Sequence, residues 1–284
     1  MNFIVAANEK YMYPLKIMLT SLLDSNREEF HHIYFLYSNV LEKTIATLKK
    51  YLEKTFKCQF LPHHIVSEDF KDFPVSHHFS IETYYRFLAQ DIIPSSEDRV
   101  LWLDADMIIR KPLKDFYYQD FEGNTLVACS SINKNPQELL DKLGCPEGTV
   151  YFNAGTILFN LKKLRNVTLR DYREFYEQNK DRITWLDQDI LNSMYALNVK
   201  IADYRIYNMQ MFSDPISEEE EKAITETSAI LHYIGGTKPW HEHYANQLGK
   251  YWIETENKAL TSMQRIKRSV RRIVRKVWRK VKGK

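Results

Sequence analysis

Two carboxylates follow one strongly apolar run of this 284-residue chain. Asp104 and Asp106 close the sequence VLWLDAD at residues 100–106, with Ala105 alone between them. Because residues i and i+2 of an extended backbone project to the same side, both carboxylates are predicted to face one point. Such a pair is unfavourable unless a cation lies between the charges, and carboxylate oxygens suit a hard divalent cation such as Mg²⁺ or Mn²⁺. The alternative interpretation is a strand that ends in a polar turn, with Asp106 solvated.

Two later segments also carry polar groups of types that bind ligands. The run FNAGTILFN at residues 152–160 places Asn153 and Gly155 inside an apolar run, and a glycine in a strand permits the close approach of a ligand or marks a bulge. The sequence WLDQDILN at residues 185–192 places two acids and a glutamine at the start of a helix. Acids at that position also interact favourably with the helix dipole, so this second segment has a purely structural interpretation as well.

A glycine-containing loop follows near the end of the chain. The sequence HYIGGTKPWH at residues 232–241 joins His232, two glycines, Lys238 and a tryptophan in one turn. A flexible glycine loop with a lysine can wrap a phosphate. A lone histidine is more often a core or surface residue than a ligand, and that alternative stays open for His232.

The elements that position these residues alternate along the first half of the chain. Strands that alternate with helices indicate β-α-β units and a mainly parallel sheet, whose ligands bind at the carboxyl ends of the strands. Asp104 and Asp106 stand where the fourth strand ends. Strands are predicted at residues 3–7, 33–38, 58–65 and 99–106, and helices at 14–25, 41–54 and 80–93, the last with Ser80 as N-cap. After residue 106, short strands are predicted at 125–130, 156–161 and 229–234, and helices at 169–180 and 185–198.

The composition is that of a soluble globular protein with a sizeable core, with 44% apolar and 27% charged residues. Three cysteines without a Cys-x-x-Cys spacing argue against a disulfide framework and a zinc site, and for a reducing compartment. The first apolar run is too short for the core of a signal peptide. No stretch has the apolar length that a membrane span needs.

The charge is distributed unevenly. Residues 263–284 contain eleven Lys or Arg and no acid, so the overall net charge of +3 leaves residues 1–262 at −8. Apolar residues in this tail fall at helical spacing, with Trp278 among them. A basic amphipathic helix of this kind is typical of anionic membrane surfaces, and we expect a cytoplasmic protein bound peripherally to the inner face of the cell membrane. Nucleic acid is an unlikely partner because the body is acidic and offers no base-reading motif.

Taken in order, the motifs resemble those of family 8 of the glycosyltransferases, the retaining galactosyl- and glucosyltransferases. The resemblance covers residues 1–244 and rests on FIVAANEKY, SIETYYRF, LWLDAD, FNAG, LDQDILN and HYIGGTKPWH. It implies an α/β fold of the GT-A type, a Rossmann-like nucleotide-binding domain with a mainly parallel central sheet. The catalytic domain is expected at residues 1–250, and a small C-terminal helical region with the basic tail at 251–284.

The resemblance implies a metal site at the carboxylate pair. Asp104 and Asp106 are expected to bind Mn²⁺ that bridges the diphosphate of a UDP-sugar, with His232 as the third ligand. Imidazole suits Mn²⁺ better than Mg²⁺, although Mg²⁺ is possible. The cation then also stabilises the charge that develops on the UDP leaving group.

The resemblance implies a donor site built from several segments. Lys238 is expected to place a point charge on a phosphate oxygen, and Arg86 to contact the donor sugar and phosphate. The chain departs from the family at Asn8, where relatives often carry Asp; an Asn carbonyl can still accept a hydrogen bond from uracil. The implied donor-binding residues are Ala6, Asn8, Tyr11, His78, Arg86, Asp104, Ala105, Asn153, Ala154, Asp187, Gln188, Gly235 and Lys238.

The resemblance also implies the mechanism. A double displacement needs a carboxylate beneath the anomeric carbon, but the matching position is Gln188, so a front-face displacement is expected. Gln188 then stabilises an oxocarbenium-like state and Asp189 orders the site, with Asp187 beside them as the third catalytic residue. Galactose from UDP-galactose is the expected donor sugar and UDP-glucose the close alternative. The acceptor is a glycan, free or on a lipid or a protein.

Two other classes of function compete with this hypothesis. A non-catalytic nucleotide-sugar-binding protein at the membrane surface is disfavoured because Asp104, Gln188, His232 and Lys238 are all retained. A phosphohydrolase with Asp104 as nucleophile is expected to carry its Asp pair at the first strand, whereas this chain has the pair at the fourth.

Overall fold

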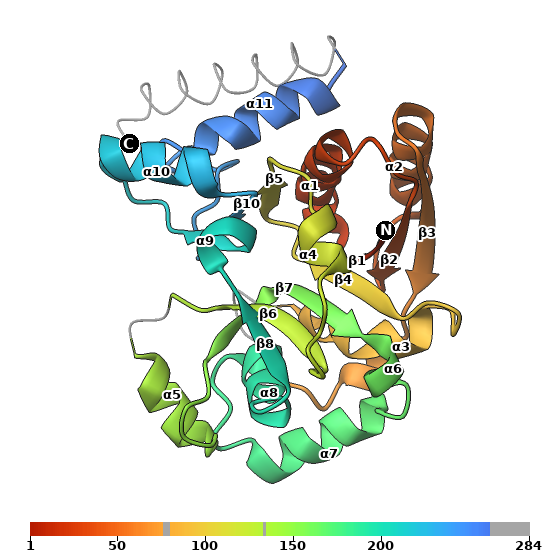
Figure 1. The fold of residues 1–284 in the computed structure, drawn as a ribbon. Helices are drawn as coiled ribbons and strands as arrows, with labels where there is room; N and C mark the ends of the chain where they lie inside the picture. The colour runs from red at the N-terminus through yellow and green to blue at the C-terminus, as the bar shows by residue number, and fades with distance from the viewer. Residues whose placement is uncertain (76–79, 133–134, 262–284) are drawn as a thin grey trace, which may run out of the picture.

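A seven-stranded sheet forms the centre of the protein in the computed structural model, which describes residues 1–75, 80–132 and 135–261 (Figure 1). The strand order is β3-β2-β1-β4-β7-β6-β8. Neighbouring strands are parallel except around β7, which runs antiparallel to both β4 and β6. The prediction of an α/β fold with a mainly parallel sheet is therefore confirmed. The strands are β1 (Asn2–Ala6), β2 (His31–Tyr37), β3 (Cys58–His64), β4 (Arg99–Leu103), β6 (Leu126–Ser130), β7 (Phe152–Asn160) and β8 (Val199–Ala202).

Helices cover both faces of this sheet, which explains why its central strands are apolar throughout rather than alternating. In β4, Leu101 and Leu103 pack under helices α1, α2 and α4, whereas Val100 and Trp102 pack on the opposite face. That opposite face is covered by η3, α6, α7 and α8. The helices are η1 (Glu9–Tyr11), α1 (Met12–Ser25), α2 (Glu42–Thr55), η2 (Ser67–Phe70), η3 (Ile81–Leu88), α3 (Ala89–Ile92), α4 (Lys114–Tyr118), α5 (Pro136–Leu143), α6 (Leu161–Leu164), α7 (Leu169–Asn179), α8 (Leu186–Met194), α9 (Tyr204–Tyr207), α10 (Glu218–Thr227) and α11 (Gly249–Ala259).

A second, three-stranded sheet lies beside the first and was not predicted as a sheet. Its order is β5 (Met107–Ile109), β10 (Ile230–Tyr233) and β9 (Met209–Met211). The antiparallel register pairs His232 with Met107, and the backbone N–H of Tyr233 donates to the carbonyl of Asp106 at 3.0 Å. This small sheet therefore carries His232, distant in sequence, to the end of β4.

The segment after residue 80 differs from the predicted α-helix. It forms the 3-10 helix η3 followed by the single turn α3, and the Ser80 side chain makes no capping hydrogen bond. In a 3-10 helix the residues i and i+3 stand on the same side. Thr83 and Arg86 are such a pair, and both contact Asp187, so the tighter helix serves the site rather than local propensity.

The last described helix, α11, packs on α1 and on the small sheet, where Trp252 is fully buried. Lys258 at its end pairs with Asp24 of α1 at 2.7 Å. Within the described residues, no helix is both long enough and apolar enough to cross a membrane. The predicted membrane-binding tail at 263–284 and the predicted donor contact His78 lie outside the described residues.

Candidate active site

Asp104 and Asp106 lie between β4 and β5, because β4 ends at Leu103 and not at residue 106 as predicted. Each carboxylate has one oxygen hydrogen-bonded to a cationic side chain. Asp104 Oδ1 accepts hydrogen bonds from Arg86 Nη2 at 3.0 Å and from Trp102 Nε1 at 2.8 Å. Asp106 Oδ2 accepts from Lys238 Nζ at 2.6 Å. Burial opposes the ionisation of Asp106, but the charge of Lys238 nevertheless holds its pKa well below the ordinary value. Asp106 is thus kept charged, and hydrogen bonds orient both carboxylates.

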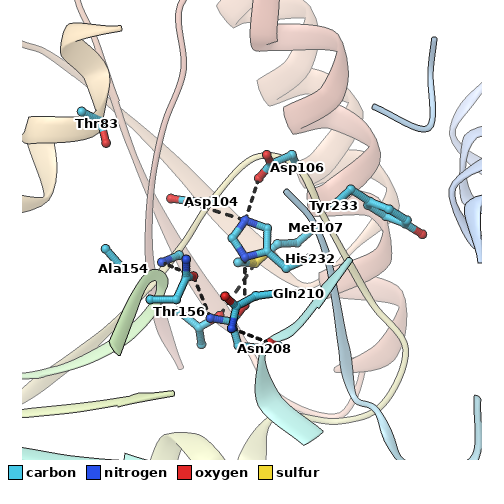
Figure 2. A network of polar contacts seen from close by, with 12 residues as sticks. Thr83, Asp104, Asp106, Met107, Ala154, Thr156, Asn208, Gln210, His232 and Tyr233 are labelled. Atoms are coloured by element: carbon cyan, nitrogen blue, oxygen red, sulfur yellow. Dashed lines mark hydrogen bonds and ion pairs between the residues drawn. The ribbon is translucent and has the colours of Figure 1, made fainter. Parts of the chain in front are cut away.

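The remaining carboxylate oxygens face one nitrogen of His232 (Figure 2). His232 Nε2 lies 3.3 Å from Asp106 Oδ1 and 3.8 Å from Asp104 Oδ2. One ligand atom from each of the three residues lies within 4.8 Å of the others, and the described residues hold this one such cluster. Two carboxylate oxygens and an imidazole nitrogen are a donor set that suits a divalent cation, so the residues present fit the predicted group.

Gly155 makes room for His232. A Cβ at this position would lie 2.4 Å from His232 Cε1 and 2.9 Å from His232 Nδ1. The sequence left open two roles for Gly155, the close approach of a ligand or a bulge. The structure shows a bulge, since the β6–β7 register shifts between Ala128 and Cys129 at this level. It also shows a close approach, by His232. The group that approaches the glycine is a side chain of the protein itself.

Arg86 joins the carboxylate pair to a third buried acid, Asp187. Its Nε lies 3.1 Å from Asp187 Oδ2, its plane lies over the Trp102 ring at 4.5 Å, and its Nη1 donates to the carbonyl of Ala154. Thr83 Oγ1 donates to Asp187 Oδ1 at 2.6 Å. Burial raises the pKa of Asp187 to about 6, and the Arg86 charge opposes that rise.

Hydrogen bonds to Asp189 stabilise the start of α8. Its Oδ1 accepts from the Tyr151 hydroxyl at 2.5 Å, and its Oδ2 accepts the backbone N–H groups of Thr184 and Trp185 at 2.6 and 2.7 Å. Leu186 between these groups and Asp187 has a φ of 53°, a left-handed conformation that few non-glycine residues adopt. Asp189 therefore stabilises the strained turn at Leu186, and this turn orients the side chains of Asp187 and Gln188.

Gln188 is hydrogen-bonded on both sides of its amide. Its Oε1 accepts from Asn153 Nδ2 at 3.0 Å and from the backbone N–H of Ala154 at 3.1 Å. Its Nε2 donates to the Tyr151 hydroxyl at 3.0 Å. The structure thus brings together Gln188 and Asn153, which the resemblance assigns to one donor site, and these hydrogen bonds fix their relative orientation.

The predicted uridine end is built by the loop after β1. Asn8 Oδ1 accepts from the backbone N–H groups of Lys10 and Tyr11 at 3.1 and 3.3 Å, and its Nδ2 donates to Glu82 Oε2 at 3.2 Å. The oxygen expected to receive uracil therefore caps η1. Burial, followed by the charges of the carboxylate pair, raises the pKa of Tyr11 to about 12, which places its hydroxyl in their field.

The glycine loop lies against the same cluster. Gly235 has a φ of 79°, which favours glycine, and a Cβ there would lie 3.3 Å from the Phe212 ring. Lys238 is 7% exposed, and its ammonium also donates to the carbonyl of Tyr233 at 2.6 Å. The glycine loop thus places the ammonium of Lys238 against Asp106.

Four residues that hold the site were missed by the sequence reasoning. Trp102 stands two residues before Asp104 on the same face of β4, and that spacing is a signal for it. Thr83 stands three residues before Arg86, which is a signal once η3 is known to be a 3-10 helix. Tyr151 and Asn208 carry no local signal, because their partners come from distant segments.

Comparison with known proteins places this geometry in a family. The sequence matches the family described as "Glycosyl transferase family 8" over residues 2–244. The chain belongs to glycosyl transferase family 8. It is similar to a lipopolysaccharide 1,3-galactosyltransferase of Salmonella typhimurium, with 24% identity over 90% of this chain and 77% of that protein. A lipopolysaccharide 1,2-glucosyltransferase of Escherichia coli is 26% identical over 83% of this chain and 71% of its own length.

A solved structure of the same type is similar in fold over nearly the whole chain. The galactosyltransferase LgtC, in complex with donor and acceptor sugar analogs, has a TM-score of 0.79 and 28% identity, covering 92% of this chain and 97% of that one. The family 8 chain therefore has the GT-A fold and is a hexosyltransferase that uses a nucleotide-sugar donor and a glycan acceptor. The Asp-Asp-His cluster is its candidate site for a divalent cation.

Proposed function

We propose that this chain transfers galactose from UDP-galactose to a hydroxyl of a glycan, with retention of the α-configuration and dependence on Mn²⁺. The observation that carries the proposal is the cluster of Asp104, Asp106 and His232, in which each carboxylate keeps one oxygen for a cation. The Salmonella relative and LgtC are both named galactosyltransferases, which supports galactose as the transferred sugar. The 1,2-glucosyltransferase relative makes UDP-glucose the second candidate donor.

The cation cluster, Lys238 and Gly235 have different roles in binding the diphosphate. A cation bound by the cluster supplies positive charge to the diphosphate and to the leaving UDP. The nitrogen ligand supports Mn²⁺ over Mg²⁺. Lys238 then exchanges Asp106 for a phosphate oxygen, for which its flexible stem and point charge are suited. Gly235 supplies the turn that this movement needs.

The engagement of both nearby acids supports a front-face displacement. Asp187 Oδ1 accepts from Thr83 and its Oδ2 faces Arg86, while Asp189 accepts from Tyr151 and from two backbone N–H groups. Neither acid has an uncommitted oxygen to attack the anomeric carbon. The bond from this carbon to the UDP oxygen breaks, the bond to the acceptor oxygen forms on the same face, and the acceptor proton passes to the departing phosphate.

The basic tail supports a membrane-associated acceptor. We place residues 263–284 on the anionic inner face of the cell membrane, because they hold eleven cations and no acid. A glycolipid acceptor, or a glycan assembled at the membrane, then meets the enzyme there. Sedimentation with anionic liposomes should retain the full chain and lose a 1–262 truncation; equal sedimentation would refute this location.

Release of UDP from a panel of UDP-sugars tests the proposal without knowledge of the acceptor. Mn²⁺-dependent hydrolysis of UDP-galactose, abolished by EDTA and by Asp106→Asn, is the expected result. The exposed Asp214→Asn variant is the matched control and should keep the activity. Turnover of UDP-glucose alone would replace the donor, and the absence of both turnover and UDP binding by calorimetry would overturn the function.

A further inference from the structure

Asn208 connects the candidate metal ligand to the candidate sugar site. It is fully buried between α9 and β9 and contacts two predicted site residues, of which Figure 2 labels His232. His232 Nδ1 lies 2.9 Å from Asn208 Oδ1, and Asn208 Nδ2 donates to Asn153 Oδ1 at 2.9 Å. The oxygen and the nitrogen of the Asn208 amide are therefore both hydrogen-bonded to residues of the candidate site.

Two backbone N–H groups fix the direction of these hydrogen bonds. The N–H of Gly155 donates to Asn153 Oδ1 at 3.0 Å, and the N–H of Ala154 donates to Gln188 Oε1 at 3.1 Å. A backbone N–H is only a donor, so each of these side-chain atoms is an oxygen. The atom of Asn208 that meets Asn153 Oδ1 must then be the nitrogen.

The direction determines the protonation of the histidine. With its nitrogen turned to Asn153, Asn208 presents its oxygen to His232 Nδ1, which must carry the proton. With Nδ1 as the N–H donor, Nε2 is the ring nitrogen left to offer a lone pair to a cation. That is the nitrogen that faces the oxygens of Asp104 and Asp106.

We propose that Asn208 is a positioning residue that fixes the cation-binding tautomer of His232 and couples it to Asn153 and Gln188. The inference rests on the proposed function, because it gives His232 the role of a ligand there. The competing arrangement puts the proton on Nε2, where Asp106 can accept it. In that arrangement His232 Nδ1 needs a hydrogen-bond donor, so the amide of Asn208 would have to be reversed. Asn208 Oδ1 would then face Asn153 Oδ1, and two oxygens would repel each other. Groups behind a histidine ligand commonly change metal affinity by about 10–100-fold.

Three variants of the full chain separate positioning from simple stability. Asn208→Leu removes both hydrogen bonds, whereas Asn208→Asp accepts from His232 but cannot donate to Asn153. Gln210→Leu is the matched control, a buried amide of β9 that is hydrogen-bonded to backbone groups of Ser130, Ile132 and Asn208. Thermal unfolding of all three variants reports the cost in stability alone.

The first readout is the tautomer of His232 in the cation-free protein at a pH of about 8.5, where unperturbed imidazole is neutral. Nitrogen NMR, assigned with His232→Ala, should place the proton on Nδ1 in the wild type and in Asn208→Asp. In Asn208→Leu the proton should move to Nε2. A wild-type proton on Nε2 would overturn the proposal even if the leucine variant failed to fold.

The second readout is the affinity for Mn²⁺ alone, measured by titration. We expect a loss of about 10–100-fold in Asn208→Leu, and wild-type affinity in Asn208→Asp and Gln210→Leu. Wild-type affinity in Asn208→Leu would contradict the inference. Neither readout uses a donor sugar, so Mn²⁺ binding with neither turnover of a UDP-sugar nor binding of UDP would refute the proposed function and leave the role of Asn208 standing.

Discussion

Replacement of Gly155 by alanine should remove cation binding while the fold remains. The new Cβ would lie 2.4 Å from His232 Cε1 and 2.9 Å from Asn153 Oδ1. Gly155 does not have a left-handed φ, so the backbone itself accepts alanine. The only cost is steric, and it falls on the side chain that completes the candidate metal site.

The distances set the size of the effect. Non-bonded carbon atoms prefer a separation of about 3.5–4.0 Å, so the imidazole must move by about 1 Å or more. Metal–ligand distances tolerate only about 0.2 Å, so a shift of this size removes the nitrogen ligand. Overpacking of this kind costs about 1–3 kcal/mol of folding free energy. We expect a loss of Mn²⁺ affinity of about 10–100-fold or more.

The assay pairs Mn²⁺ titration with thermal unfolding, and Gly249→Ala is the matched control. A Cβ at Gly249 would lie 2.9 and 3.0 Å from the Tyr244 ring, in α11 and among no candidate ligand. Both variants should lose stability, at about 2–4 °C in melting temperature per kcal/mol, but only Gly155→Ala should lose Mn²⁺ affinity. Wild-type Mn²⁺ affinity in Gly155→Ala would refute the role assigned to His232.

Three further predictions concern charged groups of the site. Lys238→Met should raise the affinity for Mn²⁺ alone, because Asp106 loses its internal cation, and should weaken UDP binding in calorimetry; weaker Mn²⁺ binding would contradict this exchange. The pKa of Asp187 is raised by burial to about 6, so the folded cation-free protein holds this proton to higher pH than the unfolded chain. Its stability in urea should therefore fall between pH 4 and 6, by up to about 3 kcal/mol, and a profile equally steep in Asp187→Asn would assign the slope to other groups. Trp102→Phe should lower Mn²⁺ affinity severalfold, because Asp104 loses a hydrogen bond of the charged type, worth about 1.5–3 kcal/mol; unchanged titration curves would show that Arg86 alone orients it.

The fold could be predicted wherever the pattern is local. The strands β1, β2, β3 and β4 are apolar runs between amphipathic helices, and each begins within about two residues of the expected place, although β4 ends three residues early, at Leu103. The small sheet escaped prediction because β5 and β9 have only three residues each, too few for a period. The helix η3 escaped because its form depends on Asp187, a residue about a hundred positions later in the chain.

The same distinction separates the residues of the site that could be predicted from those that could not. Asp104 and Asp106 are recognisable because they directly follow an apolar strand with a single residue between them. Asn208 is not, since its role depends on Asn153 of β7 and His232 of β10, which approach it only after folding. A single asparagine before a short strand has no feature that distinguishes it from a turn residue.

The charges around the carboxylate pair explain how the site remains folded before it binds a cation. Three buried or half-buried acids, Asp104, Asp106 and Asp187, face two cationic side chains, Arg86 and Lys238, which leaves one net negative charge. A divalent cation reverses that sign and leaves one net positive charge, which attracts a diphosphate. On the proposed function, a bound cation would also neutralise Asp106, and Lys238 would then be available for a phosphate oxygen. The Lys238–Asp106 pair limits repulsion between the acids, and it would supply the phosphate ligand when a cation binds.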